Sequence, residues 1–272
     1  MKKTFALMLA LLLILSLFAG CAKEEEKETT LIVFAAASMT ETLTEIEKLY
    51  KEAAPNVKLV FTFESSGTLK TNIENGADCD LFISAGQKQM NQLDATADAE
   101  INPKGLDFVL AESRCNLLEN KVALAVPQGN PKGIHSYADL KAALESGTVL
   151  LAMGNEDVPV GQYTQKILSY FGLDEAALAQ KGCITYGSNV KEVTSQISEK
   201  AVDCGIIYQT DAYSAGLNVV DTATAEMCGQ VIYPAAVLKT SKHQTEAQAF
   251  LDFLKTPAAA AVFESVGFTP VQ

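Results

Sequence analysis

Several residue types are scarce in this 272-residue sequence, and each shortage excludes a class of function. There is no tryptophan, Arg114 is the only arginine, and 21 basic residues face 33 acidic ones, for a formal net charge of −12. Nucleic-acid binding requires clustered positive charge, so the composition argues against it. The sequence contains no P-loop, no G-x-S-x-G elbow and no G-x-G-x-x-G turn, and therefore gives no support to the enzyme classes that use them.

Metal-ligating and redox patterns are missing as well. The two histidines, His135 and His243, lie in polar segments without ligand-like spacing to other candidates. No two cysteines have the C-x-x-C spacing of zinc or redox motifs. Apart from Cys21 there are five cysteines, so at least one is unpaired. The sequence leaves open whether the others form one disulfide or are all buried free thiols: Cys79, Cys115, Cys183, Cys204 and Cys228.

The longest apolar run is too short to cross a membrane. It extends from Phe5 to Phe18, after two lysines and before Ala19-Gly20-Cys21, whereas a membrane-spanning helix needs about 20 apolar residues. A charged start, a short apolar stretch and small residues are typical of a secretory signal. We interpret 1–20 as a signal peptide. The small residues before Cys21 resemble the bacterial lipobox, which predicts lipidation of Cys21; an ordinary cleaved signal is the alternative.

A charged segment follows the predicted cleavage site. Residues 21–29 are polar and rich in glutamate and lysine, a composition that predicts a disordered tether between the lipid anchor and a globular body. Removal of the signal would take away Lys2 and Lys3 and no acids, which changes the net charge from −12 to about −14. An acidic surface of this kind is unfavourable for capture of an anion.

The body of about 240 residues alternates strands with amphipathic helices, which predicts an α/β fold with largely parallel sheets covered on both faces. The predicted strands are 30–34, 57–63, 80–84, 121–126, 149–153, 183–186, 204–208 and 230–238. The predicted helices begin near 39, 68, 87, 137, 160, 190, 246 and 258. Open parallel sheets bind ligands at the carboxyl ends of their strands, so the strand-to-helix loops are the candidate sites.

Four of these loops are rich in neutral hydrogen-bond donors. They are 35–41, 64–68, 158–161 and 187–190, and Tyr208 closes a buried strand beside them. Helix N-termini present unpaired N–H groups and a partial positive charge, which together bind anions without a lysine or arginine. Such a site would accept a dianion inside an acidic protein. Ser38 and Glu41 also have the spacing of a capping box, so helix capping is the alternative role of Ser38.

At these residues the sequence resembles the periplasmic molybdate-binding proteins, from about Leu31 to Thr269. The matching segments are V-F-A-A-A-S at 33–38, S-S-G-T-L at 65–69, D-L-F-I-S-A at 80–85, D-V-P-V-G-Q-Y at 157–163 and G-I-I-Y-Q-T-D-A at 205–212. The C-terminal segment from Lys255 to Thr269 also fits the family. Several matches in the same order are more specific than any one of them.

The resemblance implies a type II periplasmic-binding-protein fold. Each of its two lobes is a mixed, mostly parallel sheet flanked by helices, and the ligand lies in the cleft between them. We place the first lobe at 30–121 and 210–272 and the second at 122–209. The implied oxyanion ligands are the hydroxyls of Ser38, Ser66 and Tyr208 and the backbone N–H groups of Ser38, Ser66, Val160 and Val190. Ser65 is an alternative to Ser66, and family members often have alanine where Val160 stands.

The implied function is capture of molybdate or tungstate outside the cytoplasm and delivery to an ABC transporter permease with its ATPase. The resemblance also implies a monomer that needs no cofactor, and Cys21 would attach it to the outer face of the membrane. Sulfate remains an alternative ligand, and so does phosphate, because Asp157 and Asp211 lie near the loops. An organic acid would usually recruit an arginine, and Arg114 lies away from them. A regulator's sensing domain would begin with a DNA-binding segment instead of a signal.

Overall fold

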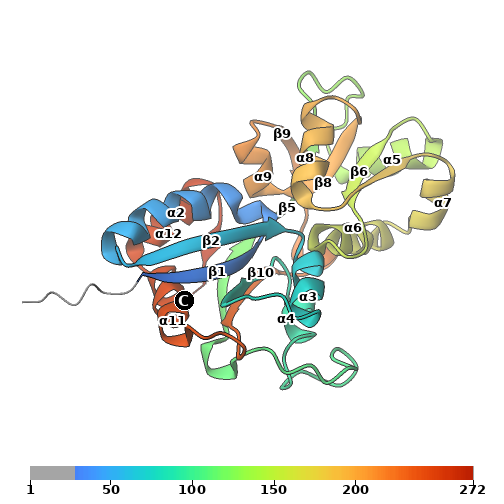
Figure 1. Cartoon of the computed structure of the whole chain (residues 1–272). Coiled ribbons are helices and arrows are strands. Elements are labelled where there is room, and N and C mark those ends of the chain that lie inside the picture. The colour runs from blue at the N-terminus through green and yellow to red at the C-terminus, as the bar shows by residue number, and fades with distance from the viewer. Residues whose placement is uncertain (1–27, 272) are drawn as a thin grey trace, which may run out of the picture.

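The computed structural model describes residues 28–271 and contains two β-sheets, each flanked by helices (Figure 1). We call the larger sheet with its helices the first lobe and the smaller sheet with its helices the second lobe. The larger sheet comprises β1 (Thr29–Ala36), β2 (Val57–Glu64), β3 (Leu81–Ile83), β4 (Cys115–Asn120), β10 (Val231–Val237) and β11 (Thr269–Pro270). The smaller sheet comprises β5 (Val122–Val126), β6 (Leu151–Gly154), β7 (Ile184–Gly187), β8 (Cys204–Tyr208) and β9 (Asn218–Thr222).

Helices cover both sheets. Those of the first lobe are η1 (Ala37–Met39), α2 (Thr40–Ala53), α3 (Ser66–Glu74), α4 (Gln87–Asn91), η2 (Ala111–Ser113), α11 (Gln244–Phe253) and α12 (Pro257–Ser265). Those of the second lobe are α5 (Tyr137–Ser146), α6 (Pro159–Tyr170), α7 (Glu175–Gln180), α8 (Val190–Ser198), α9 (Gln209–Ser214) and α10 (Ala225–Cys228).

Both sheets are mixed, with a parallel part at one side. In the first lobe the order is β11-β4-β10-β3-β1-β2, where β1 runs parallel to β2 and β3 and β10 is antiparallel to both of its neighbours. In the second lobe the order is β7-β6-β8-β5-β9, with β6 parallel to β7 and β8. The parallel strands of each lobe therefore aim their carboxyl ends, and the helices that follow, toward one edge.

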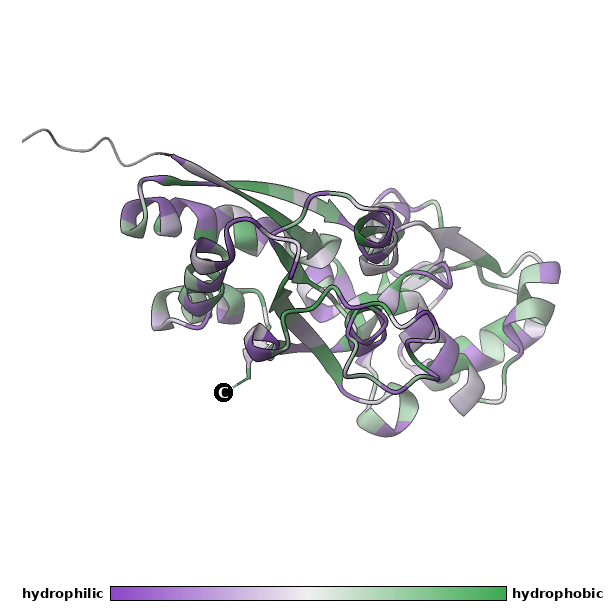
Figure 2. Ribbon diagram, turned by 60° about the horizontal axis from the view of Figure 1, so that its bottom comes forward, coloured by the Kyte–Doolittle hydropathy of each residue, from purple (hydrophilic) through white to green (hydrophobic). Residues whose placement is uncertain are grey.

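Alternate residues of the first strand supply two different cores. Leu31, Val33 and Ala35 belong to the apolar cluster that includes residues of α2, α11 and α12. Phe34, from the opposite face of β1, packs with Leu69 of α3 in a second cluster. Because successive side chains of a strand point to opposite faces, a nearly continuous apolar strand is what a sheet covered on both sides requires. The central strands accordingly appear apolar in the hydropathy view (Figure 2).

The chain crosses between the lobes at two adjacent antiparallel pairs. Only Lys121 separates β4 in the first lobe from β5 in the second, and residues 223–230 lead from β9 back to β10. On either side of this crossing, β4 pairs with β10 and β5 pairs with β9. The sequence analysis assigned 210–272 to the first lobe, but β9 pairs within the second sheet. We therefore propose that the second lobe extends through α10, to about residue 228.

The first residues of the chain lie outside the described range, including the predicted signal peptide 1–20 and Cys21. Of the predicted tether, Thr29 belongs to β1. Among residues 28–271, no helix has the length and apolar character to cross a membrane. The five cysteines in this range are all free thiols, and four are buried, while Cys115 is half-buried. The possible disulfide is therefore not formed in this structure.

Candidate functional site

A small cavity of about 10 Å³ lies where the strand-to-helix loops of the two lobes meet. Its lining comes from both lobes and includes all five residues that the sequence analysis proposed as oxyanion ligands. The first lobe contributes Ala36, Ala37, Ser38, Glu64, Ser65, Ser66 and Ala85, and the second contributes Val158, Pro159, Val160, Val190 and Tyr208. At this volume the cavity holds about one water molecule, so the lobes must separate slightly from this arrangement to admit a larger ligand.

Ser65 and Ser66 have different roles at the start of α3. Ser65 is the N-cap, and its Oγ accepts from the Thr68 N–H at 3.1 Å. Ser66 is the first helical residue, and its Oγ accepts from the Ala85 N–H at 2.9 Å. An N–H group can only donate, so this contact uses an acceptor site of the Ser66 hydroxyl and leaves its proton free for another acceptor. Ser66 is therefore the better candidate donor to an anion.

Ser38 does not cap a helix, contrary to the capping-box alternative. It lies within the short η1 turn, and the N-cap of α2 is Met39, whose side chain makes no capping bond. The Ser38 Oγ instead lies 2.9 Å from the hydroxyl oxygen of Tyr233, a residue of β10. The reason is the extra turn of 3₁₀ helix, which shifts the start of α2 two residues beyond Ser38. The serine hydroxyl is thus held beside the cavity.

The second lobe presents two helix N-termini. Pro159 occupies the first position of α6 and Val160 follows it, while Asn189 caps α8 by accepting from the Glu192 N–H at 3.1 Å. Backbone N–H groups in a first helical turn lack intrahelical acceptors and carry the positive end of the helix dipole. Val160 and Val190 are both buried, at 0% and 4% exposure. Both residues line the cavity, so their N–H groups are candidate donors to a bound anion.

Tyr208 closes β8 and is almost fully buried between the lobes. Its hydroxyl donates to the Ala85 carbonyl across the cleft at 3.4 Å. Burial, with added effects of Tyr233, Tyr163 and Asp211, raises the pKa of Tyr208 well above its ordinary value. The phenol therefore keeps its proton, which it donates to Ala85 in this arrangement and would have to turn toward an anion in order to serve as a ligand.

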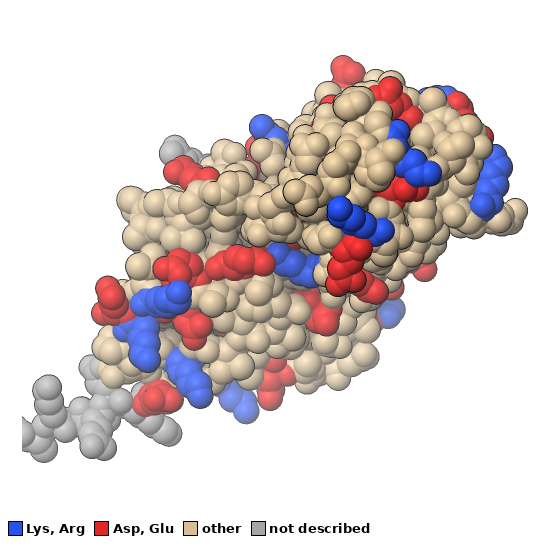
Figure 3. All heavy atoms as spheres, turned by 90° about the horizontal axis from the view of Figure 1, so that it is seen from above, with Lys and Arg blue, Asp and Glu red and all other residues tan. Residues whose placement is uncertain are grey.

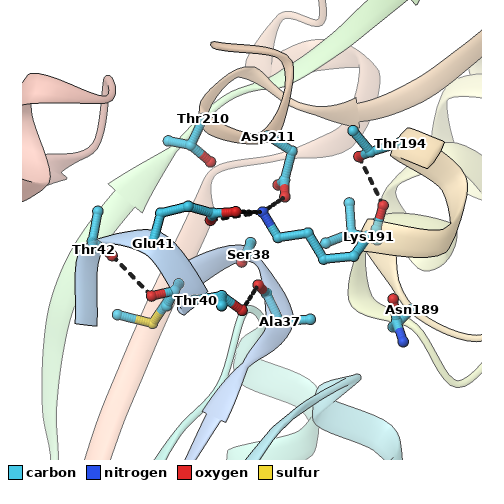
Figure 4. Close-up of polar contacts among 12 residues, drawn as sticks. Ala37, Ser38, Thr40, Glu41, Thr42, Asn189, Lys191, Thr194, Thr210 and Asp211 are labelled. Carbon is cyan, nitrogen blue, oxygen red and sulfur yellow. Dashed lines mark hydrogen bonds and ion pairs between the residues drawn. The ribbon is translucent and has the colours of Figure 1, made fainter. Parts of the chain in front are cut away.

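The lobes are held together by polar contacts beside the cavity (Figure 4). The Lys191 ammonium of α8 lies 2.7 and 2.8 Å from the two carboxylate oxygens of Glu41 in α2, and 3.0 Å from Asp211 of α9. Asn189 also donates to Glu64 across the cleft at 3.1 Å. We call Glu41, Lys191 and Asp211 the interlobe ion cluster. It joins a helix that begins beside Ser38 to the helix that begins with Val190.

The backbones of the two lobes also touch. Gly67 of α3 approaches the second lobe so closely that a Cβ atom there would lie 2.1 Å from the Asp157 carbonyl oxygen. Only glycine permits this approach, because any side chain would collide with backbone. The structure therefore represents a closed arrangement of the lobes.

Asp211 is an unusual member of the ion cluster. It is 1% exposed, and among the described residues neither of its side-chain oxygens has a partner with hydrogen-bond geometry. Its contact with Lys191 is thus a close ion pair without hydrogen-bond alignment. Burial raises the pKa of Asp211 to about 6, against the opposing effect of Lys191. Burial acts to lower the pKa of Lys191, but Asp211 and Glu41 together raise it.

The charges around the cavity agree with a site built from neutral donors. Glu64 is the only ionisable acid among the lining residues, and its Oε2 accepts from Asn189 and from the Ser65 N–H. On the face shown in Figure 3, acidic and basic side chains are interspersed, without a continuous basic patch. Within residues 28–271, no group of three or more His, Cys, Asp or Glu side chains is placed to hold a metal ion.

A larger groove of about 880 Å³ runs along α6 and α10. Lysines and a glutamate are mixed among its lining residues, which include Lys88, Lys166 and Glu226. Of the five predicted ligand residues, none lines it. We therefore base the candidate site on the small interlobe cavity.

Three residues that contact the predicted site were not found from the sequence. Asn120 and Tyr233 continue the hydrogen-bond chain from Ser38, and Lys191 joins the lobes. Tyr233 lies in an apolar strand, where a tyrosine is ordinarily a core residue. The polar residue Asn120 at the crossing between the lobes could have indicated a buried hydrogen-bond network. Its partners Thr210 and Tyr233, however, are 90 and 113 residues away in the sequence.

Comparison with known proteins places these features in context. Residues 31–269 match the family model of the bacterial extracellular solute-binding proteins. A Bacillus subtilis protein, provisionally named as a substrate-binding lipoprotein of an ABC transporter, is 32% identical over 276 aligned positions that cover 99% of each chain. The molybdate-binding protein of Escherichia coli (strain K12) is 34% identical over 256 positions, with 92% of each chain covered.

The fold also agrees with a solved structure. The periplasmic molybdate-binding protein of Azotobacter vinelandii superimposes with a TM-score of 0.74, at 22% identity, over 89% of this chain and 100% of that one. At this identity the likeness concerns the fold alone. It confirms the predicted α/β periplasmic-binding-protein fold, with two mixed sheets flanked by helices.

Proposed function

Because this chain belongs to the bacterial extracellular solute-binding proteins, we propose that it captures molybdate or tungstate outside the cytoplasm and delivers the anion to an ABC transporter. The observation that carries the proposal is the convergence of neutral donors from both lobes on one small cavity. The proposed ligands are the hydroxyls of Ser38, Ser66 and Tyr208 and the backbone N–H groups of Ser38, Ser66, Val160 and Val190. The relatives named for molybdate binding support this choice.

A site made of donors suits a fully deprotonated dianion. Molybdate and tungstate carry no proton near neutral pH, so every one of their oxygens accepts hydrogen bonds. The Ser66 hydroxyl accepts from the Ala85 N–H and keeps its proton for another acceptor, and the Tyr208 phenol stays protonated and could turn its proton from the Ala85 carbonyl to the anion. Hydrogen bonds to a charged acceptor are stronger than neutral ones. Binding in a buried cavity strengthens them further, because water is excluded.

Organic acids fit the cavity less well. The single arginine, Arg114, pairs with Asp94 and donates to Gln87 at 3.0 Å, and it does not line the cavity. An arginine fork is the common way to hold a carboxylate.

The cellular role follows from the N-terminal sequence. We propose that 1–20 directs export, that Cys21 carries a lipid, and that the polar residues after it hold the body outside the membrane. The binding protein would act as a monomer, without a cofactor and without catalysis, and present the closed, loaded form to a permease driven by its ATPase.

The position of Glu64 supports phosphate as a second candidate ligand. Its carboxylate lines the cavity and could accept the proton that phosphate keeps near neutral pH. Sulfate, which differs from molybdate mainly in size, is the other alternative. Both would leave the fold and the transport role unchanged.

Titration calorimetry can distinguish these ligands. It suits this protein because there is no tryptophan to report binding by fluorescence. The body without signal and tether would be titrated with molybdate, tungstate, sulfate and phosphate. We expect one-to-one binding of molybdate and tungstate that is at least about a hundredfold tighter than binding of sulfate or phosphate, equivalent to about 2.7 kcal/mol. If only sulfate or phosphate gave heat, that anion would be the ligand in place of molybdate. If none of the four anions gave heat, the proposal would be refuted.

A further inference from the structure

A continuous chain of side-chain hydrogen bonds leads from Ser38 to the crossing between the lobes. The Ser38 Oγ lies 2.9 Å from the Tyr233 hydroxyl oxygen, and the Asn120 Nδ2 lies 3.2 Å from that oxygen. The same Nδ2 donates to the Thr210 Oγ1 at 3.0 Å. All four side chains are at least 96% buried, with exposures of 4% for Ser38, 3% for Asn120, 1% for Thr210 and 0% for Tyr233.

The orientation of the Asn120 amide is fixed by the backbone. Its Oδ1 accepts from the Lys121 N–H at 2.8 Å, and a backbone N–H can only donate. The amide nitrogen must therefore face Tyr233 and Thr210, and as an NH₂ group it donates to both. Two donated hydrogen bonds use both of its protons.

The orientation of Asn120 sets the direction of the next hydrogen bond. The Tyr233 oxygen accepts from Asn120, so its own proton needs a different acceptor, because a buried hydroxyl is rarely left unpaired. Among the described residues, Ser38 is the other partner that meets the Tyr233 hydroxyl with hydrogen-bond geometry, at 2.9 Å; the neighbouring Tyr208 hydroxyl donates its own proton to the Ala85 carbonyl. Tyr233 consequently donates to Ser38.

We propose that Asn120 and Tyr233 are positioning residues that force the Ser38 hydroxyl to act as a donor toward the anion. Because one Ser38 lone pair accepts from Tyr233, the Ser38 proton points away from Tyr233 and toward the cavity, just as the N–H donated by Ala85 directs the proton of Ser66. This inference rests on the proposed function, in which Ser38 binds the anion. It makes the site selective for anions that carry no proton, because a protonated oxygen facing Ser38 would meet another donor.

A double-mutant cycle tests whether Tyr233 acts through Ser38. Molybdate affinity would be measured by calorimetry for the wild type, Ser38→Ala, Tyr233→Phe and the double variant. We expect Tyr233→Phe to weaken binding about tenfold, the equivalent of one hydrogen bond, when Ser38 is present. In the Ser38→Ala background the same change should alter the affinity by less than about twofold, because coupled residues are not additive.

Tyr163→Phe is the matched control. Tyr163 also packs against Tyr208, but its hydroxyl donates to the Gln230 carbonyl at 3.5 Å and lies outside the chain of hydrogen bonds. We expect this variant to bind molybdate as the wild type does. Equal losses from Tyr233→Phe in both backgrounds would overturn the inference, since they would indicate a purely structural role.

Asn120→Asp provides a second test through selectivity. An ionised aspartate accepts where the amide donated, so Tyr233 would donate to residue 120 and accept from Ser38. Ser38 would then present a lone pair to the cavity. We expect molybdate affinity to fall by more than about tenfold, while phosphate affinity falls less or rises. Losses of the same factor for both anions would contradict the inference.

The outcomes separate the two proposals. If the wild type does not bind molybdate, the proposed function fails and the positioning role fails with it. If the wild type binds molybdate and Ser38→Ala weakens it, but Tyr233→Phe and Asn120→Asp leave affinity and selectivity unchanged, only the positioning role fails. Thermal unfolding of each variant would verify that it is folded at the temperature of the titration.

Discussion

At the scale of single residues, the site depends on which hydroxyl protons are free. Adjacent serines at the start of α3 differ in this respect, since Ser65 caps the helix while the Ser66 hydroxyl accepts from Ala85 and keeps its proton for the cavity. The sequence predicted the donor-rich loops and the Tyr208 position, because these follow from strand ends and helix starts. It left Ser65 and Ser66 as alternatives, because which of the two caps α3 depends on where the helix begins.

Replacement of each serine by alanine should separate binding from stability. We expect Ser66→Ala to weaken molybdate binding by about tenfold or more, because it removes a donor to a charged acceptor. Ser65→Ala should lower the free energy of unfolding by about 1 kcal/mol through loss of the cap, with a smaller change in affinity. Calorimetry and urea denaturation would measure the two effects, and the reverse pattern would assign the ligand role to Ser65.

Asp211 should make the stability of the protein fall as pH rises, the opposite of the usual effect of an aspartate, because its pKa is raised on folding. Its pKa in the folded protein is raised to about 6, whereas an unfolded aspartate titrates near 3.8. Between these values the unfolded chain has lost the proton that the folded protein retains. The contribution of Asp211 to stability is therefore fully present below about pH 3.8 and is lost as pH rises through about 6.

Asp211→Asn should remove this dependence. We expect the variant and the wild type to be similarly stable near pH 4, and the variant to gain relative to the wild type as pH rises, by roughly 2–3 kcal/mol at pH 7.5. Urea denaturation of both proteins across this pH range would measure the difference. A difference that stayed constant with pH would show that Asp211 titrates as an ordinary exposed aspartate.

At the scale of helices and strands, the elements with strong patterns were predicted closely. Strands buried on both faces, such as β1 and β8, and helices with regular apolar spacing, such as α8, agree within a few residues. The elements that were not predicted from the sequence are β4, β9, β11, η1, η2, α7, α9 and α10. They are short, and strands such as Asn218–Thr222 mix polar and apolar residues without strict alternation. Their pairing partners, distant in the sequence, stabilise them instead.

The close contact between α3 and the second lobe leads to a further prediction. A Cβ atom at Gly67 would lie 2.1 Å from the Asp157 carbonyl oxygen, although the helix itself would tolerate alanine. Gly67→Ala should therefore leave each lobe folded and keep the lobes apart. We expect molybdate binding to weaken by more than about tenfold, a cost of at least about 1.4 kcal/mol. Calorimetry would measure the affinity, and thermal unfolding would measure the stability. An unchanged affinity would mean that Gly67 and Asp157 are not in contact when ligand is bound.

At the scale of the whole molecule, the ligand and the lobes depend on each other. In the proposed site, donors from both lobes reach an anion together only when the cleft is closed, so we expect binding to favour the closed form. The interlobe ion cluster favours the same form without touching the ligand, since Lys191 joins Glu41 in one lobe to Asp211 in the other. This cluster was not predicted from the sequence, because Glu41 and Lys191 are 150 residues apart.

Lys191→Met should make closure less favourable. We expect molybdate affinity to fall severalfold, about 3- to 10-fold, at low salt, and the difference from wild type to shrink at high salt as screening weakens the ion pairs. Lys48→Met is the matched control, because Lys48 pairs with Glu45 at 2.6 Å on the exposed face of α2, within one lobe. Equal molybdate affinities for wild type and Lys191→Met at low salt would show that the ion cluster does not stabilise the closed form.

The most direct test of the central claim is a crystal structure of the body grown with tungstate, with the metal located by its anomalous scattering. We predict one strong peak in the interlobe cavity, with tungstate oxygens within hydrogen-bond distance of the hydroxyls of Ser38, Ser66 and Tyr208 and of the Val160 and Val190 N–H groups. A peak at any other place, or no ordered tungsten at saturating concentration, would contradict the assignment of this cavity as the oxyanion site.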